Sequence, residues 1–213
     1  MNDPIYRSYL NILKSELITA LGCTEPIAIA YAAAKAREVL GEFPKRALVR
    51  CSGNIVKNVK SVTVPNSGGM VGIEIAAILG IVGGNAEAKL EVLTGITDVH
   101  REKARELLNA NFCQCRLQTG VDNLYVNVPV ESDSHSAQVI VMNRHTFITK
   151  VVRDGEVLFE HTPINSEVTA EHPEMTMADI LDFANSVRME DIDEVIGRQV
   201  ALNSAISEEG LTG

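Results

Sequence analysis

The chain has 213 residues, of which 46% are hydrophobic and 4% aromatic, and its formal net charge is −9. This length and apolar content allow a sizeable aliphatic core and exclude a disordered, solvating chain. The acidic balance, without any basic run, argues against nucleic acid or an anionic membrane as the main partner.

No segment has the features of a membrane anchor or a secretion signal. The longest apolar run, residues 68–84, is rich in glycine, contains Glu74 and is shorter than the ~20 residues that span a bilayer. Charged residues interrupt the first residues of the chain throughout, unlike a signal peptide. We therefore expect a cytoplasmic protein.

The N-terminal half reads as helices interrupted by two strands. Apolar residues at helical spacing predict one helix over 4–20, and Pro26, which suits a first helical turn, opens a second one that Gly41 ends. Strands are predicted at 46–51 and, from polar–apolar alternation, at 56–64. Further along, the pattern predicts a buried helix at 70–79, an ambiguous helix or strand at 86–93 and a surface helix at 98–109.

The C-terminal half reads as strands followed by helices. Strands are expected at 113–119, 124–130, 137–142, 147–153 and, after a turn at Asp154-Gly155, 157–160. Helices are expected again from residue 176. The order predicts an α+β fold with N-terminal helices, a central mostly antiparallel sheet packed by helices, and C-terminal helices. We expect an α+β domain over 1–175 and a helical segment over 176–213.

The cysteines and histidines form no metal-binding pattern in the sequence. Cys23, Cys51, Cys113 and Cys115 include no CxxC pair, so we expect four free thiols in a reducing compartment. The histidines, at positions 100, 135, 145, 161 and 172, show no i,i+4 pairing. His145 is the most interesting of them because it falls between two strands, although a structural role is the simpler interpretation.

The stretch LGCTEPI, residues 21–27, breaks the chain between two helices. Cys23 would lie just before a helix N-terminus, where exposed N–H groups and the positive dipole end would lower a thiol pKa or favour an anion. Thr24 could serve as the N-cap, and Glu25 suits the first turn. The alternative is a helix cap with an incidental cysteine.

Two further polar stretches could bind a ligand. PNSGGMVG, residues 65–72, follows a predicted strand and opens a helix, so Asn66, Ser67, Gly68 and Gly69 could form a backbone cradle for an anion. It matches neither GxGxxG nor the P-loop pattern, and the alternative is a tight turn. SGNIVKNVK offers four polar groups that could equally be a solvated strand face: Ser52, Asn54, Lys57 and Asn58.

Three segments together resemble a known family. GCTEPIAIAYAAAKA, SGNIVKNVKSVTVPNSGGMVGIEIAAILG and AQVIVMNRHTFI resemble, in this order, the N-terminal half of the L-cysteine desulfidase family, relatives of the iron–sulfur L-serine dehydratases. The resemblance implies a lyase that uses a [4Fe–4S] cluster held by three cysteines, with one iron open to substrate and no pyridoxal phosphate. Cys23 corresponds to the first ligand. The resemblance implies that the other two family ligands belong to a C-terminal half, which is absent from this chain and into which the helical segment 176–213 would lead. It also implies that this chain alone is inactive and holds no stable cluster.

The implied reaction is α,β-elimination on L-cysteine, which gives sulfide, ammonia and pyruvate. The substrate carboxylate would rest on residues 66–69 or on the Thr24–Glu25 helix start, with Ser52 and Asn54 as further substrate contacts. Lys57 is a candidate for the Cα base if it is buried, because burial favours the neutral amine. The alternatives are an L-serine dehydratase of the same chemistry and a non-catalytic amino-acid-binding module. The expected partner is a small amino acid, without nucleic acid or membrane, and a homo-oligomer is compatible with the sequence.

Overall fold

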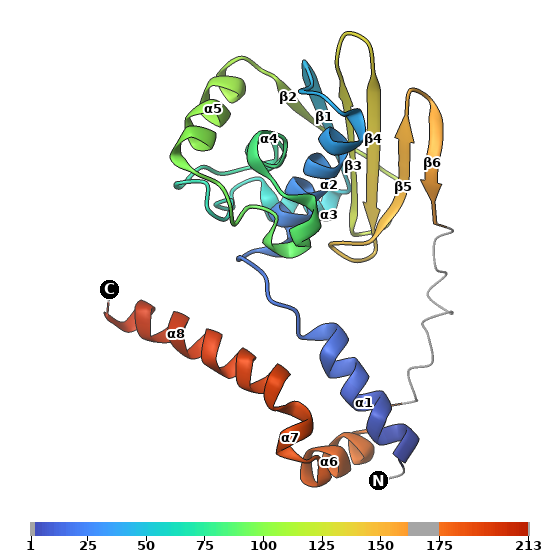
Figure 1. Cartoon of the computed structure of the whole chain (residues 1–213), viewed down its shortest axis with the longest axis vertical. Coiled ribbons are helices and arrows are strands. Elements are labelled where there is room, and N and C mark those ends of the chain that lie inside the picture. Colours follow the sequence, from blue (N-terminus) through green and yellow to red (C-terminus); the bar gives the residue numbers. More distant parts are fainter. Residues whose placement is uncertain (1–2, 162–174, 213) are drawn as a thin grey trace. The chain divides into compact units, whose positions relative to one another are not determined.

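The computed structural model describes residues 3–161 and 175–212. The chain divides into two compact units, one spanning Ala20–Pro163 and the other combining Met1–Thr19 with Ile164–Gly213 (Figure 1). The first unit contains the sheet and the helices that pack on it, and the second is helical. This division differs from the expected boundary after residue 175 because the N-terminal helix packs with the C-terminal helices.

The sheet has six strands in the order β2-β1-β3-β4-β5-β6. They are β1 (Arg46–Cys51), β2 (Cys113–Leu117), β3 (Tyr125–Glu131), β4 (Ser136–Met142), β5 (Ile148–Arg153) and β6 (Glu156–Glu160). β1 pairs with β2 in parallel, and every other pair is antiparallel. The fold is therefore α+β with a mostly antiparallel sheet, as predicted.

The turn between β5 and β6 confirms the Asp-Gly hairpin signal. Asp154 and Gly155 have φ of 50° and 83°, the left-handed pair that matches the twist of a two-residue hairpin. Asp154 also accepts hydrogen bonds from the Ser136 backbone N–H (2.7 Å) and from His135 Nδ1 (2.8 Å). The carboxylate thus ties the hairpin turn to the start of β4.

The core lies between one face of the sheet and the helices α2 (Thr24–Leu40), α4 (Ile73–Gly83) and α5 (Asp98–Asn109) (Figure 1). Every residue of α2 from Pro26 to Ala34 is buried, because small alanines on all sides let the helix fit between the sheet and α4. A Cβ atom at Gly80 of α4 would lie 2.2 Å from the Ala30 carbonyl oxygen. The two helices therefore touch backbone to backbone.

The segment 56–64, predicted as a second strand, is not a strand: its first four residues, 56–59, belong to a helix. Gly53–Val59 forms α3, and only Thr63 makes an isolated bridge, to Val71. Ser52 is the N-cap, and its Oγ accepts a hydrogen bond from the Ile55 N–H at 3.3 Å. Ile55 and Val59 are both buried, so the apolar residues also fit a helical i,i+4 spacing. The ambiguous segment forms a 3₁₀ helix, η1 (Ala86–Glu91).

The helical unit contains α1 (Asp3–Glu16), α6 (Met177–Ser186), α7 (Met189–Ile192), a short π-helical turn (Asp193–Gly197) and α8 (Arg198–Thr212). Phe183 of α6 packs against the rings of Tyr6 and Tyr9, with centroid distances of 5.5 and 5.2 Å. The Tyr6 hydroxyl donates to Asp191 Oδ2 at 2.6 Å. Among the described helices of both units, none is long and apolar enough to cross a membrane.

Candidate functional site

The GCTEP stretch forms the start of α2. The helix begins at Thr24, and Cys23 occupies the N-cap position without a side-chain capping bond. The prediction of Thr24 as the N-cap is therefore wrong by one residue. Thr24 and Cys23 instead direct their side chains to Glu25: Cys23 Sγ donates to Glu25 Oε2 at 3.2 Å, and Thr24 Oγ1 lies 3.5 Å from the same oxygen.

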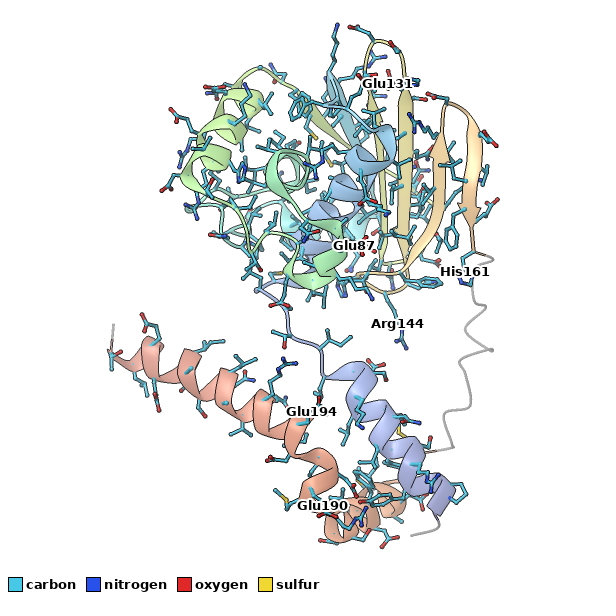
Figure 2. All side chains as sticks on the ribbon, viewed as in Figure 1. Glu87, Glu131, Arg144, His161, Glu190 and Glu194 are labelled. Carbon is cyan, nitrogen blue, oxygen red and sulfur yellow. The ribbon has the colours of Figure 1, made fainter. Side chains whose placement is uncertain are left out.

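Two side chains from distant segments join this helix start. His145, in the turn between β4 and β5, places Nε2 3.2 Å from Thr24 Oγ1. Asn58 of α3 donates from Nδ2 to Glu25 Oε1 at 3.4 Å. We call this group, Cys23, Thr24, Glu25, Asn58 and His145, the α2 polar cluster. Figure 2 labels Arg144, the residue before His145, at the end of the sheet opposite to Glu131. The cluster therefore lies at the Arg144 end of the sheet.

The contacts within the cluster set its protonation. Partial burial raises the pKa of the Cys23 thiol, and Glu25 adds to this effect, so the expected lowering by the helix N-terminus does not prevail. Burial alone would raise the pKa of Glu25, but hydrogen bonds from Cys23, its own backbone N–H and Asn58, together with nearby His145, hold it below the usual value. Partial burial lowers the pKa of His145 against the opposing effect of Glu25. A charged carboxylate thus lies beside a neutral imidazole and a protonated thiol.

The PNSGG loop is held in place by its own polar side chains. Asn66 Nδ2 donates to the carbonyl oxygens of Leu93 (2.9 Å), Thr94 and Ile96 (both 3.3 Å). Ser67 is buried, and its Oγ donates to the Met70 carbonyl oxygen at 2.9 Å. These two side chains are therefore occupied inside the protein, and any cradle in this loop would be formed by its backbone groups.

The two glycines of the loop are exposed and have left-handed backbones, with φ of 72° at Gly68 and 86° at Gly69. Within the described chain their N–H groups have no hydrogen-bond acceptor. Arg101 lies beside them and holds the loop through the Asn66 carbonyl oxygen (3.0 Å) and Asn66 Oδ1 (2.5 Å). Arg105 extends past Gly68 as well. Arg101 is also paired with Asp98 at 2.6 Å, so the free amides and the Arg105 guanidinium are the groups that suit a carboxylate or phosphate.

The loop and the helix start are neighbours. A Cβ atom at Gly22 would lie 3.1 Å from Pro65 Cγ, so the chain before Cys23 packs directly on the first residue of the PNSGG loop. The two motifs that the sequence singled out therefore belong to one region of the Ala20–Pro163 unit.

The remaining predicted contacts lie on α3 and do not join the cluster. Ser52 is buried as the α3 cap, where its Oγ also donates to the Asn123 carbonyl oxygen at 2.5 Å. Asn54 and Lys57 are exposed. The burial that would make Lys57 a base is absent, so it is not a good candidate for the Cα base.

The other three cysteines lie on the helix-covered face of the sheet, Cys51 on β1 and Cys113 and Cys115 on β2. All four thiols are free, as predicted. Burial raises the pKa of Cys113. Over residues 3–161 and 175–212, no group of three or more His, Cys, Asp or Glu side chains is arranged to hold a metal ion. This chain offers Cys23 as one exposed thiol, and a three-cysteine cluster would need two ligands from elsewhere.

Sequence reasoning named His145 and Asn58 but did not place them in the site. The sequence signal for His145 was its place between two predicted strands, and that for Asn58 was its spacing of four residues from Asn54. Among the other histidines, His100 accepts a hydrogen bond from the Thr97 N–H (3.2 Å) and His135 contacts Asp154. His172 lies outside the described residues.

Comparisons with known proteins give relatives of greater length. The chain is 45% identical over 213 residues to a UPF0597 protein of Finegoldia magna, covering 97% of this chain and 50% of the relative. It is 44% identical to a UPF0597 protein of Lachnoclostridium phytofermentans and 39% identical to one of Treponema denticola, with similar coverage. The chain thus spans about half the length of the curated relatives it matches. No family model and no solved structure matches the chain.

Proposed function

We propose that this chain forms the substrate-binding part of an iron–sulfur lyase that cleaves L-cysteine by α,β-elimination to sulfide, ammonia and pyruvate. The observation that carries the proposal is the α2 polar cluster, in which an exposed thiol, a charged carboxylate and an imidazole meet next to a loop with free amides. The resemblance to the L-cysteine desulfidase family supports the choice of chemistry. Free thiols support a cytoplasmic location.

The two sides of the region match the two charges of an amino acid. The Glu25 carboxylate can bind the substrate ammonium group, because hydrogen bonds keep it ionised. The Gly68 and Gly69 amides, with Arg105 beside them, can bind the substrate carboxylate, while Arg101 holds the loop in place. Glu25 already occupies the α2 N-terminus, so the glycine loop is the better carboxylate site of the two that the sequence suggested.

His145 replaces Lys57 as the candidate acceptor of the Cα proton. Its imidazole is partly buried and is held by Thr24 at 3.2 Å, whereas Lys57 is exposed. An imidazole of this kind can take a proton at neutral pH. Cys23 would provide one thiolate ligand to a [4Fe–4S] cluster. When bound, such a cluster supplies a Lewis-acidic iron for the leaving sulfur.

The test is an anaerobic assay on the complete natural protein with Cys23→Ser, His145→Gln and Cys115→Ala variants. Sulfide release from L-cysteine should fall by about 100-fold or more in the first two variants, because each loses a group that acts on the reacting atoms. Cys115→Ala is the matched control because its thiol lies in the sheet, and it should keep its activity. Cys23→Ser should also lose iron, and His145→Gln should keep it.

Other outcomes discriminate between the alternatives. Pyruvate formation from L-serine without sulfide release would assign an L-serine dehydratase. Amino-acid binding that Gly69→Val abolishes, without turnover of either substrate, would assign a binding module. An active, iron-replete Cys23→Ser protein would contradict the ligand role of Cys23.

A further inference from the structure

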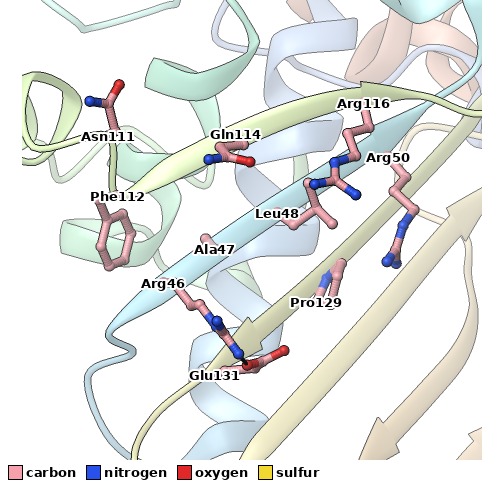
Figure 3. Close-up of a pocket in the computed structure, with 10 residues that line it drawn as sticks. All are labelled: Arg46, Ala47, Leu48, Arg50, Asn111, Phe112, Gln114, Arg116, Pro129 and Glu131. Atoms are coloured by element: carbon pink, nitrogen blue, oxygen red, sulfur yellow. Dashed lines mark hydrogen bonds and ion pairs between the residues drawn. The ribbon is translucent and has the colours of Figure 1, made fainter.

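A second polar feature lies on the opposite face of the sheet from the core helices. A cavity of about 350 Å³ opens over β1, β2 and β3, and Figure 3 shows its arginine side chains rising from the strands around Leu48. The charged side chains that line it are Arg46, Arg50, Arg116 and Glu131, and Gln114, Leu48 and Pro129 are among its other lining residues. We call this the arginine pocket. It shares no residue with the α2 polar cluster or the PNSGG loop.

Two of the three arginines have no acidic partner in the described chain. Arg46 is paired with Glu131, with Nε 2.6 Å from Oε2. Arg50 and Arg116 make no such pair within residues 3–161 and 175–212, so the pocket keeps about two uncompensated positive charges.

The same two arginines are directly opposite each other in the parallel register of β1 and β2. Strand neighbours lie ~4.8 Å apart, and like charges in this arrangement repel. On its other side Arg50 faces Asn127, a buried neutral amide that accepts from Gln138 Nε2 at 2.9 Å. Across β2, β1 and β3 this row therefore carries two cations and no anion, in a chain with 28 acidic residues. Its next charged residues are Lys150 and Glu160 on β5 and β6, which pair with each other. A bound anion would compensate this repulsion.

We propose that the arginine pocket binds a small phosphate monoester. A phosphate group concentrates nearly two negative charges on one centre and accepts bidentate hydrogen bonds from guanidinium groups, which matches two arginines one strand spacing apart. Gln114 adds an amide donor at the rim. Leu48 and Pro129 provide an apolar floor for the carbon part of the ligand, which inorganic phosphate lacks. A dicarboxylate would spread the same charge over two centres and fit less well.

The experiment is calorimetric titration of the complete natural protein with phenyl phosphate, inorganic phosphate and succinate at constant ionic strength. We expect phenyl phosphate to bind most tightly and succinate most weakly. Arg50→Gln and Arg116→Gln should each weaken phenyl phosphate binding about tenfold or more, because each removes a charged hydrogen-bonding partner. Arg198→Gln, an exposed arginine of α8, is the matched control and should bind as the natural protein does.

A melting experiment separates loss of the site from loss of the fold. Without phosphate, Arg116→Gln should melt at the same temperature as the natural protein or slightly above it, because the repulsion with Arg50 is removed. Phenyl phosphate at about 100 times its Kd for the natural protein should raise the melting temperature of the natural protein by about 5 °C, and that of the variant by about half as much or less because the variant binds about tenfold more weakly. Three results would each overturn the proposal. The natural protein and both pocket variants could bind phenyl phosphate equally, succinate could bind as tightly as phenyl phosphate, or single-stranded RNA could be the ligand that binds while the phosphate compounds do not.

Discussion

Helices α2 and α8 have similar lengths, 17 and 15 residues, but opposite environments. In α2 the residues from Pro26 to Ala34 are all buried, whereas every residue of α8 is exposed. Both helices contain alanines and large aliphatic residues. What differs is which residues surround each helix: small residues on all sides allow α2 to be enclosed, whereas α8 carries polar residues all round between Val200, Leu202 and Ile206.

This difference explains why the candidate site is built on α2. A helix that touches α4 backbone to backbone cannot shift without disturbing the core, so its first residues hold fixed positions. Cys23, Thr24 and Glu25 lie at that end. A helix held only by its own hydrogen bonds, such as α8 in its unit, would give no such rigid support.

The largest difference is expected when a glycine is changed to alanine at the α2–α4 contact and in α8. Gly80→Ala would place a methyl group 2.2 Å from the Ala30 carbonyl oxygen, so α2 and α4 must separate, and the free energy of unfolding should fall by about 4 kcal/mol or more. Gly210→Ala in α8 meets no atom within 4 Å and should stabilise that helix by up to about 1 kcal/mol. Denaturant unfolding followed by circular dichroism measures both. Similar effects at the two positions would remove the contrast between the helices.

Truncation of an isoleucine in each helix should give the next largest difference. Ile29→Ala in α2 leaves a cavity at a fully buried position and should cost about 3 kcal/mol. Ile206, which is 72% exposed in α8, should cost less than about 0.5 kcal/mol when changed to alanine. Hydrogen exchange by mass spectrometry should show the loss of protection in α2 for the first variant. A cost above 2 kcal/mol for Ile206→Ala would mean that α8 is covered in solution.

The smallest expected effect is the acid dependence that Asp191 gives to the stability of the helical unit. Hydrogen bonds from Tyr6 and Arg188 hold the pKa of Asp191 below its usual value. The unfolded state then binds the proton more tightly, so the stabilisation is complete above about pH 4 and is lost as the pH falls through the lowered native pKa. Asp191→Asn should flatten this acid dependence in melts between pH 2 and 6. Glu194→Gln is the control. Glu194 is an exposed acid labelled in Figure 2, and its replacement should leave the acid dependence unaltered.

The strand block was predictable because its signals are local. Alternating β-branched residues and the Asp154-Gly155 turn define β3 to β6 without reference to the rest of the chain. The strand predicted over 56–64 failed because Ile55, Val56 and Val59 are compatible with both periods. Ser52 as a helix cap was the signal that would have decided for α3.

The candidate site was predictable only in part for the same reason. A thiol, a hydroxyl and a carboxylate at a helix start attract attention within one short stretch. Their partners Asn58 and His145 reach the cluster through tertiary packing, which spacing along the sequence does not encode. Likewise, the sequence does not indicate that the side chains of Asn66 and Ser67 donate to backbone carbonyl groups, and only the fold shows these contacts.

The parallel pairing of β1 with β2 also has a consequence for the order in which the chain folds. β3 to β6 are successive antiparallel strands joined by short turns, so they can pair through contacts that are close in sequence. β2 can pair with β1 only after α3, α4, η1 and α5 have been placed between them. Closing so long a loop carries a large entropic cost before any contact compensates it. The β3–β6 meander should therefore form early, and the parallel edge, which carries the arginine pocket, should be completed last.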